Sequence, residues 1–342
     1  MNKSSFPRLA LIVLVLTVLF GLTVSGATLV VDGSDPDCDD STGTPYCSIQ
    51  AAVDYASSGD TIEIYNSFDN SYVYKENVEV EKLLDLVGFL GGLGSIEEAY
   101  PNIDGGWIDG AGNFTDAGDA LWLKGTESEP ITQAEVYTLI LKNGGLNDPG
   151  LGDGLAGALG LSFVEDSVVV VDASESEVGI DLFRSHDNLI GGSFVHDNYF
   201  LGIDLYGSNR NEIRDSEIYD NQWMGIWIGH NPGDGFTAED NLVKSNIIEN
   251  SDWTGVVLHY ADSNEVIDND ILDNYHDGVF LRNSHYNLIE DNLIEGNKSG
   301  IALHASEENE ILDNIIRSND DWGIFLNDSD DNYIHFNEIY DN

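Results

Sequence analysis

The chain carries very little positive charge. Its 342 residues include only 13 lysines and arginines against 62 acidic residues, which gives a formal net charge of −49. A surface of this sign repels nucleic acids and anionic membranes, so neither is an expected partner. Two interpretations of the acidic excess stay open. It is either a solvated coat suited to salty surroundings, where salt screens the self-repulsion, or a surface that binds hard cations such as calcium.

Long hydrophobic runs are also missing, except at the N-terminus. Two basic residues among the first eight precede an apolar run from Leu9 to Val24, and small residues follow it. This order is typical of a signal peptide, so residues 1–27 are expected to direct export and to be cleaved; retention as an uncleaved anchor is the alternative. No later run is apolar over the length of a membrane helix. The mature chain, residues 28–342, is therefore expected to be secreted or at the cell surface, without a membrane span.

Cysteine and methionine are scarce. Eight residues separate Cys38 from Cys47, and in an exported protein such a pair predicts a disulfide bond. A metal site is the less favoured alternative, because two cysteines without a nearby His provide half a ligand set. Only one methionine follows Met1, so no cluster of Met, Cys and His suits copper. We therefore expect no metal centre and no cofactor, with calcium in the Asp-Gly-rich loop 147–154 as the alternative.

Helical patterns are nearly absent as well. Only Ser48–Ala56 places apolar residues on one helical face, with Ser48 as the N-cap. What the chain has instead, over residues 179–342, is one unit written seven times. Each copy opens with Gly and alternating aliphatic residues, and the spacings between these glycines are 23, 23, 30, 23, 22 and 23 residues. The glycines are Gly179, Gly202, Gly225, Gly255, Gly278, Gly300 and Gly323.

Asparagines recur in the same frame. One follows the Gly in every copy, a second closes every copy (Asn250 in the third), and five copies add a middle one. The aliphatic residues between them alternate, so that Ile301 and Leu303 point to one side and Ala302 to the other. Short strands punctuated by Asn, Asp and Gly, in a repeat of this length, predict an all-β solenoid: a parallel β-helix with rungs about 4.8 Å apart. Stacked Asn side chains are expected to bond each other along its axis.

The expected domain, residues 28–342, has three parts. Residues 28–87 hold the first coils and the helix, which is expected to cover the open N-terminal end. Residues 88–178 form irregular coils with Gly-rich loops, and residues 179–342 form the seven regular coils. No capping segment follows the seventh copy, so end-to-end contact with a partner or a second copy through this end is a further expectation.

The frame Gly-Ile-x-Leu…Asn-x-Ile-x-x-Asn resembles the repeats of NosD-like and pectate-lyase-like proteins. Residues 47–56, 59–62 and 74–78 are similar to the opening segment of the same family. The resemblance covers most of residues 28–342 and implies a right-handed, single-stranded parallel β-helix with function on the outward face of one sheet. Members include polysaccharide lyases, hydrolases and epimerases, and also surface proteins without assigned chemistry. The Asp-Pro-His-Asp stretch of the lyases and epimerases is missing here, and the link of NosD to copper is not carried over.

Outward positions of the strand that follows each Gly are expected to stack into two columns. They carry several aromatic residues, and three tryptophans lie just before their Gly, at the rim of the same face. Aromatic faces flanked by carboxylates suit sugar rings, unless loops cover these aromatics or they pack on one another. The insertion 230–240 of the third copy leaves the coil beside this face, where loops concentrate function. The candidate saccharide-binding residues are Tyr206, Trp223, Trp227, His230, Trp253, Phe280 and Trp322.

Two groups on this face are candidates for catalysis. Asp181 and Asp204 share a column on adjacent rungs, and paired carboxylates at about 5 Å serve as acid and nucleophile in retaining glycoside hydrolysis. The alternative is ordinary surface aspartates, with or without a shared cation. His259, Arg282 and His304 stack on consecutive rungs, where Arg suits a uronate carboxylate and His the removal of a proton from the sugar. The alternative is a polar rim that neutralises an acidic face.

Three functions follow from these observations. The first is an exported protein that binds polysaccharide or cell-envelope glycan, or builds the envelope. The second is a secreted polysaccharide lyase, hydrolase or C5-epimerase that uses the outward face of one sheet. The third is a structural module that assembles end to end. The residues alone leave open whether the chain is an enzyme.

Overall fold

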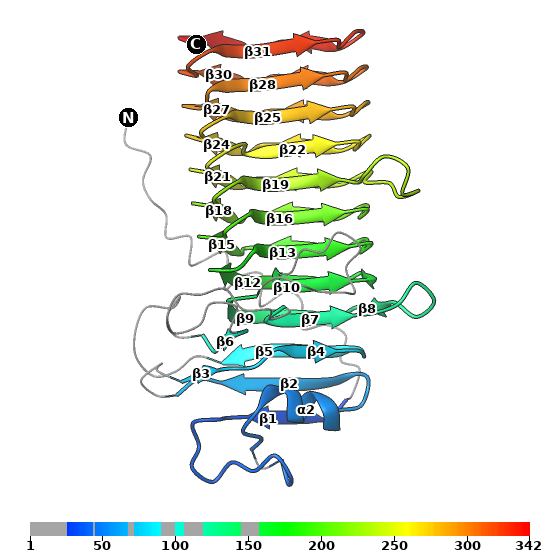
Figure 1. Ribbon diagram of the computed structural model, residues 1–342, viewed down its shortest axis with the longest axis vertical. Helices are drawn as coiled ribbons and strands as arrows, with labels where there is room; N and C mark the ends of the chain where they lie inside the picture. The colour runs from blue at the N-terminus through cyan, green and yellow to red at the C-terminus, as the bar shows by residue number, and fades with distance from the viewer. Residues whose placement is uncertain (1–25, 44, 68–71, 90–99, 106–118, 145–156) are drawn as a thin grey trace.

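The protein is a right-handed parallel β-helix, seen here in a computed structural model (Figure 1). The structure describes residues 26–43, 45–67, 72–89, 100–105, 119–144 and 157–342. Nearly all of the expected signal peptide and the whole loop 147–154 lie outside these residues. Among the described residues, no helix is both long and apolar enough to span a membrane. The predicted fold class is confirmed.

One face of the solenoid is a ten-stranded parallel sheet, to which successive coils contribute one strand each (Figure 1). It contains the strands that follow the repeated glycines, as the alternation predicted. In chain order they are β4 (Val78–Val80), β7 (Leu121–Lys124), β10 (Gly157–Ser162), β13 (Val178–Phe183), β16 (Leu201–Tyr206), β19 (Met224–Gly229), β22 (Val256–His259), β25 (Asp277–Arg282), β28 (Ser299–His304) and β31 (Trp322–Asn327).

The other faces belong to a 21-stranded parallel sheet that divides into two branches, because β12 pairs with both β14 and β15. On the N-terminal side, where β9 likewise pairs with both β5 and β6, it contains β1 (Thr28–Val31), β2 (Asp60–Tyr65), β3 (Val73–Tyr74), β5 (Leu84–Phe89), β6 (Asn102–Asp104), β9 (Glu135–Lys142) and β12 (Val168–Ser174). A small separate sheet pairs β8 (Ile131–Thr132) with β11 (Val164–Glu165).

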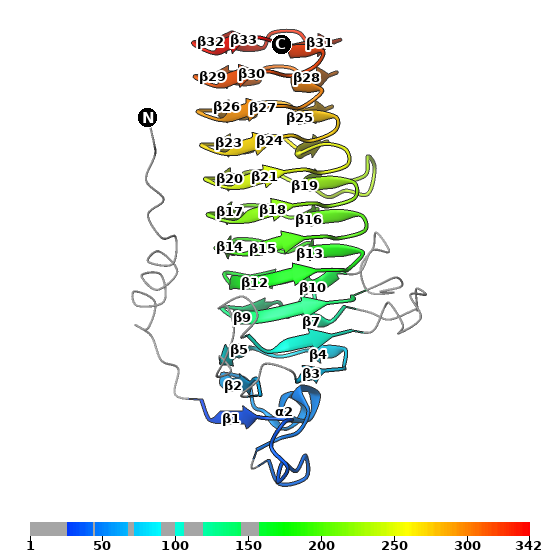
Figure 2. The same cartoon turned by 90° about the vertical axis from the view of Figure 1, so that its left-hand side faces the viewer.

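The two branches run side by side up the stack (Figure 2). The first contains β14 (Leu189–Gly191), β17 (Glu212–Arg214), β20 (Leu242–Lys244), β23 (Glu265–Ile267), β26 (Leu288–Glu290), β29 (Glu310–Leu312) and β32 (Tyr333–His335). The second contains β15 (Phe194–His196), β18 (Glu217–Tyr219), β21 (Ile247–Glu249), β24 (Asp270–Leu272), β27 (Leu293–Glu295), β30 (Ile315–Arg317) and β33 (Glu338–Tyr340).

Inward aliphatic side chains of all faces form one continuous core. Ile301 and Leu303 are fully buried in it, as the strand phase predicted. The glycine that opens each copy lies at the start of its strand and, in all copies but the last, in close contact with the next coil. A Cβ on Gly225 would stand 2.7 Å from the carbonyl oxygen of Gly255 and 2.8 Å from a methyl of Ile248, so no larger residue fits without a shift. Ala302 points outward as predicted, but it is buried as well, because it lies between its register partners Phe280 and Phe325.

Three ladders of buried asparagines hold the corners. Except at Asn221 and in the last described coil, each side-chain amide donates to the amide oxygen of the next rung and to a backbone carbonyl, while its own oxygen accepts from a backbone N–H. In the middle ladder, for example, Asn269 donates to Asn292 at 3.0 Å and to the carbonyl of Val243 at 2.9 Å. The residue before each ladder position has a positive φ, such as 58° at Asp268, and Asp and Asn tolerate this conformation. The expected Asn stacking is confirmed.

The third copy corrects one detail of the repeat. Asn250 was expected to close it, but Asn250 is exposed with φ 55°, and Ser251 takes the ladder position instead. The backbone N–H of Ser251 donates to the side-chain oxygen of Asn274 at 3.0 Å. Because Asn250 stands next to Ser251 in the sequence, the repeat pattern indicated an Asn at every closing position.

The N-terminal end carries the helix α2 (Ile49–Tyr55) beside β1 and β2 (Figure 1). Its N-cap is Ser48, as predicted, and the carboxylate of Glu76 accepts from the N–H groups of Ile49 and Gln50 at 2.9 Å each. At the other end, the ammonium of Lys82 donates to two helix carbonyls at 3.0 Å. Both helix ends are therefore satisfied by groups from the coils that the helix covers.

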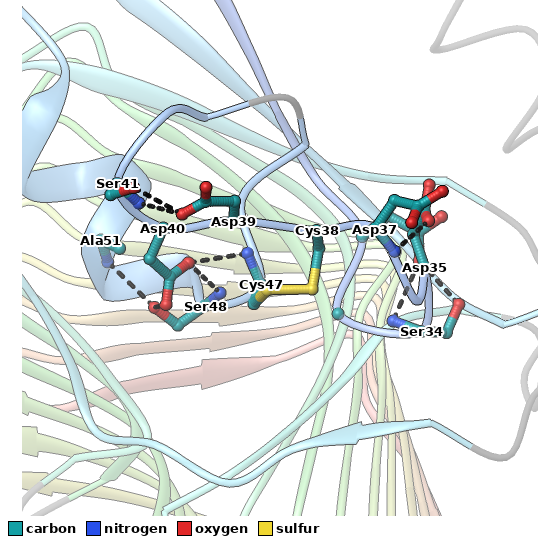
Figure 3. The surroundings of a disulfide bond; sticks show 12 residues. Ser34, Asp35, Asp37, Cys38, Asp39, Asp40, Ser41, Cys47, Ser48 and Ala51 are labelled. Carbon is teal, nitrogen blue, oxygen red and sulfur yellow. Dashed lines mark hydrogen bonds between the residues drawn. A yellow bond between two sulfur atoms is a disulfide. The ribbon is translucent and has the colours of Figure 1, made fainter.

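The predicted disulfide bond between Cys38 and Cys47 joins the loop that precedes α2 to the start of this helix (Figure 3). Within the loop, the carboxylate of Asp40 accepts from the backbone N–H groups of Cys47 and Ser48. The disulfide and Asp40 together fix where the helix begins.

The last described coil, β31 to β33, lies at the opposite end of the stack (Figure 1). Leu326 and Ile339 are 43% and 47% exposed there. Contact of this end with a partner or a second copy stays a prediction.

Candidate functional site

The outer face of the ten-stranded sheet carries the predicted columns in the predicted register. Asp181 pairs with Asp204, Asp204 with Trp227, and the order continues through Val257, Phe280, Ala302 and Phe325. The second column runs through Phe183, Tyr206, Gly229, His259, Arg282, His304 and Asn327. The period-2 alternation and the repeat spacing together fixed these neighbours.

The aspartates of the first column are not open to solvent. Asp181 is fully buried and Asp204 is 2% exposed. Asp119, which lies just before β7, two strands from β13 in the sheet, is also buried; its carboxylate accepts from the N–H of Gly157 and lies against Gly160 of the intervening β10. The alternative interpretation of ordinary surface aspartates is therefore wrong. A saccharide that approaches from solvent would reach the pair only after a rearrangement, so its role as acid and nucleophile stays a prediction.

Next to the aspartates, the insertion covers Phe183 and Tyr206 of the second column. Phe236 of the insertion packs edge-on against Phe183 and Tyr206, with ring centres 6.1 Å from each. The hydroxyl of Tyr206 donates to the carboxylate of Asp234 at 2.7 Å and accepts from the side chain of Asn231 at 2.9 Å. Burial, and then the bond to Asp234, raise the pKa of Tyr206 to about 12. Tyr206 therefore holds the insertion in place, and its ring is closed to a sugar.

His230 begins the same insertion. Its Nδ1 lies 3.3 Å from the carboxylate of Asp234 and 3.0 Å from the carbonyl oxygen of Asn231. Its ring centre is 6.0 Å from that of Tyr260. His230 thus belongs to the loop, at its junction with the sheet.

Trp227 connects two aromatic and aliphatic clusters on this face. Its ring centre lies 5.9 Å from that of Tyr206 and 6.0 Å from that of His259. It also packs with Phe280 and the buried Val257 in a cluster on the rim side. Trp227 is half-buried, so part of its ring stays open beside the insertion.

The rim carries a ladder of rings that the sequence placed only in part. Phe200 and Trp223 are 4.2 Å apart between ring centres, Trp223 and Trp253 are 5.1 Å apart, and Trp253 and His276 are 5.9 Å apart. Backbone hydrogen bonds of 2.7 Å join Trp253 to Trp223 and His276 to Trp253. Trp253 is 39% exposed. Phe200 and His276 were missed because they do not stand out as tryptophans, although the 23-residue period identifies both positions.

Trp322 does not belong to this ladder. It pairs with Ser299, one position inward of the rim, and it contacts Phe325 at 4.9 Å between ring centres. Three coils separate it from the coil of Trp223. The sequence pattern grouped Trp322 with Trp223 and Trp253 because all three lie just before their Gly. Trp322 precedes its Gly by one residue and the other two by two residues, so Trp322 stands in a different column.

Basic side chains follow Trp227 towards the C-terminal end. Arg282 stands between His259 and His304 on adjacent strands, and Arg282 and His304 are exposed. Burial lowers the pKa of the His259 ring, and the nearby positive charges of Arg282 and His230 lower it further. The predicted stacking of these three residues is present.

In the described part of the chain, no group of three or more His, Cys, Asp or Glu side chains is arranged to hold a metal ion. Both cysteines are joined in the disulfide, and Met224 is buried. The loop 147–154, suggested for calcium, lies outside the described residues, so that suggestion stays a prediction.

Comparison with protein families identifies the family of this chain. The NosD family, described as periplasmic copper-binding protein, matches residues 156–320 and 274–342, which together span more than half of the chain. The chain belongs to the NosD family. The family description supports an extracytoplasmic location. The copper-binding part of that description does not fit the described residues of this chain, which offer no donor set of sulfur and imidazole groups.

Solved structures agree on the fold. The A-module of mannuronan C-5 epimerase AlgE4 from Azotobacter vinelandii has a TM-score of 0.55 and 15% identity, over 85% of this chain and 94% of that one. The periplasmic alginate epimerase AlgG has a TM-score of 0.52 and 12% identity, over 82% and 77%. The Dettilon tailspike protein has a TM-score of 0.51 and 11% identity, over 90% and 62%. A comparison with curated protein sequences finds no match.

Proposed function

We propose that this extracytoplasmic β-helix protein binds polysaccharide, such as a cell-envelope glycan, on the outer face of the ten-stranded sheet. The observation that carries the proposal is the rim ladder beside Trp227. Trp253 keeps 39% of its surface exposed while its neighbours Trp223 and His276 hold it on both sides. A ring fixed in this way loses little conformational freedom when a sugar stacks on it.

Support also comes from the arrangement of the face. Half-buried Trp227 lies between the rim and the insertion. The sheet therefore presents two aromatic surfaces, the rim ladder and Trp227. Two proteins that share the fold are epimerases by name, one of alginate and one of mannuronan, and both therefore handle a polysaccharide. The proposal places the glycan across Trp253, Trp223 and Trp227.

The test is a glycan array on the mature chain, followed by calorimetric titration of any glycan that binds. Trp253→Ala is expected to weaken binding at least about tenfold, as the loss of an aromatic anchor does. Tyr286→Ala is the matched control, because Tyr286 is 59% exposed and lies in a turn away from the rim. Equal affinities of wild type and Trp253→Ala would place the site elsewhere, and absence of binding on the array would refute glycan recognition.

A second candidate function is catalysis on polysaccharide by a lyase, hydrolase or C5-epimerase. It is favoured by the register of Asp181 with Asp204 and by His259 beside Arg282. Assays for new reducing ends, for unsaturated uronate absorbance and for the uronate epimer ratio cover the three reactions. Asp204→Asn should abolish hydrolysis and His259→Gln should abolish proton removal. Activity that survives both variants would argue against this face.

If the array and the activity assays are both negative, the envelope-module function remains. Sedimentation of the mature chain over a range of concentrations then tests self-association, including contact through the end formed by β31 to β33. Copper delivery forms no part of the proposal, because the described residues provide no suitable ligand set.

A further inference from the structure

Arg282 differs from the other arginines that the structure describes. Four of these five form an ion pair with a carboxylate, at 2.7–3.3 Å, and Arg282 forms none within the described residues. In a chain with 62 acidic residues, an arginine left without such a partner is unusual. The paired ones are Arg184 with Glu127, Arg210 with Asp187, Arg214 with Glu212 and Arg317 with Glu295.

Two histidines flank Arg282. His259 and His304 occupy the same outward column on the strands before and after it. The ring of His259 is 6.0 Å from Trp227 between centres, which joins this basic column to the proposed glycan site. Burial, and then the positive charges of Arg282 and His230, lower the pKa of His259, which favours a neutral His259 ring beside the charged guanidinium of Arg282.

We infer that the bound glycan is an acidic one, and that Arg282, flanked by His259 and His304, binds its carboxylate or sulfate groups. This inference rests on the proposed polysaccharide binding at Trp253 and Trp227 and names the class of ligand. The planar guanidinium fork matches a carboxylate or sulfate through two parallel hydrogen bonds, and a neutral hydroxyl offers no such partner.

The acidic surface elsewhere restricts where such a ligand can bind. A net charge of −49 repels a polyanion at long range, but salt at about 0.15 M screens interactions beyond about 8 Å. The direct contact at Arg282 acts within that distance. Affinity for an acidic glycan should therefore not fall steeply when salt rises from low to physiological concentration, in contrast to a polyanion that binds an evenly basic surface.

The experiment titrates the mature chain with three hexasaccharides: oligogalacturonate, which carries carboxylates; heparin hexasaccharide, which carries sulfates as well; and neutral cellohexaose. At least one acidic probe is expected to bind more tightly than cellohexaose. Arg282→Gln is expected to weaken it about tenfold, as the loss of a charge-assisted hydrogen bond does. The control is Arg214→Gln, which removes the same charge from β17 on a different sheet and should change the affinity less than twofold.

The outcomes separate the inference from the function on which it rests. Tighter binding of cellohexaose, or no effect of Arg282→Gln, overturns the acidic-glycan inference and leaves glycan binding intact. Equal losses in Arg282→Gln and Arg214→Gln also overturn it, because net charge rather than a site would then be responsible. Absence of binding by any of the three probes overturns the inference, and the glycan array then decides the proposed function by itself. A preference for heparin over oligogalacturonate, or the reverse, identifies the anionic group.

Discussion

Ser251 follows Asn221 in an asparagine ladder, and its buried hydroxyl makes no hydrogen bond to any residue that the structure describes. The two coils before it have Asn at the equivalent position, and there the side chain of Asn198 donates to the side-chain oxygen of Asn221 at 2.9 Å. Beyond the break, Asn274 resumes the ladder by donating to Asn297 at 3.0 Å. The third coil thus lacks one rung of side-chain bonds at this corner.

Restoring the rung should stabilise the protein. Ser251→Asn is expected to add side-chain bonds to Asn221 and Asn274, each worth about 0.5 to 1.5 kcal/mol. Denaturant unfolding monitored by circular dichroism measures the gain. Ser251→Ala is the control, and it should be nearly neutral because the hydroxyl that it removes has no partner. A loss of stability in Ser251→Asn would show that the third coil has no room for the amide.

The core of the regular coils gives a second prediction. Leu303→Ala should lower the free energy of unfolding by about 2 to 5 kcal/mol, because Leu303 is fully buried in a continuous core. His304→Ala, one residue further on the exposed side, should change it by less than about 0.5 kcal/mol. Equal losses at the two positions in denaturant melts would contradict the inward and outward phase of β28.

How far the sequence alone predicts the molecule differs between fold and site. Period-2 alternation and a 23-residue repeat fix which side chains are neighbours, so the columns at Asp204, Trp227 and Arg282 were predictable. Burial on the outward face was not. It depends on side chains from other segments, as where Phe236 covers Tyr206, and no local pattern encodes such a contact. The hydroxyl of Tyr206 likewise bonds Asp234 through the fold of a loop that no repeat describes.

Trp227 illustrates the consequence for mutagenesis. The residue faces outward, which predicts little effect of Trp227→Ala on stability, yet it packs with both clusters of the outer face. Trp227→Ala is therefore expected to lower stability by about 1 to 3 kcal/mol as well as to weaken glycan binding. Thermal unfolding beside titration separates the effects. Lost binding with an unchanged melting temperature would show that Trp227 acts only as a recognition surface.

The pH dependence of stability should include a contribution from His196. Its Nε2 lies 3.2 Å from Asp172 and its Nδ1 lies 2.7 Å from Asp197. Burial alone would lower the pKa of His196, but the hydrogen bonds to the two carboxylates raise it above the ordinary value of 6.5. Since the folded protein holds the proton more tightly than the unfolded chain, this contribution is complete below about pH 6.5 and is lost as pH rises through the folded pKa.

The measurement compares wild type with His196→Gln by urea unfolding at pH 5.5, 7.0 and 8.5. The difference in the free energy of unfolding should be largest at pH 5.5 and smallest at pH 8.5. Wild type should be the more stable of the two at pH 5.5, because the protonated ring of His196 then lies between two carboxylates. A difference that grows with pH would contradict this protonation state.

The disulfide supports a local prediction. Cys38 and Cys47 are nine positions apart, and replacing both with Ser should destabilise the N-terminal end by about 2 to 4 kcal/mol. Because a solenoid opens from its ends, hydrogen exchange of the amides in Ile49–Tyr55 is the sensitive measurement. Amides of β25 serve as the internal control and should keep their protection. Unchanged exchange in the helix would mean that Ser48, Glu76 and Lys82 suffice to hold it.

The side-chain hydrogen bond from Asn211 to Asn241 joins residues 30 positions apart, and the bond from Asn188 to Asn211 joins residues 23 positions apart. Both bonds are 3.1 Å long. The height of each rung is therefore independent of how much chain separates two rungs. A corner loop is thus free to lengthen, shorten or change its residues without shifting the strands above it. Diversity in recognition can accumulate at the corner that carries residues 230–240 while the sheet beneath keeps its spacing, so relatives with different loops at this corner should present different ligand preferences on superimposable frames.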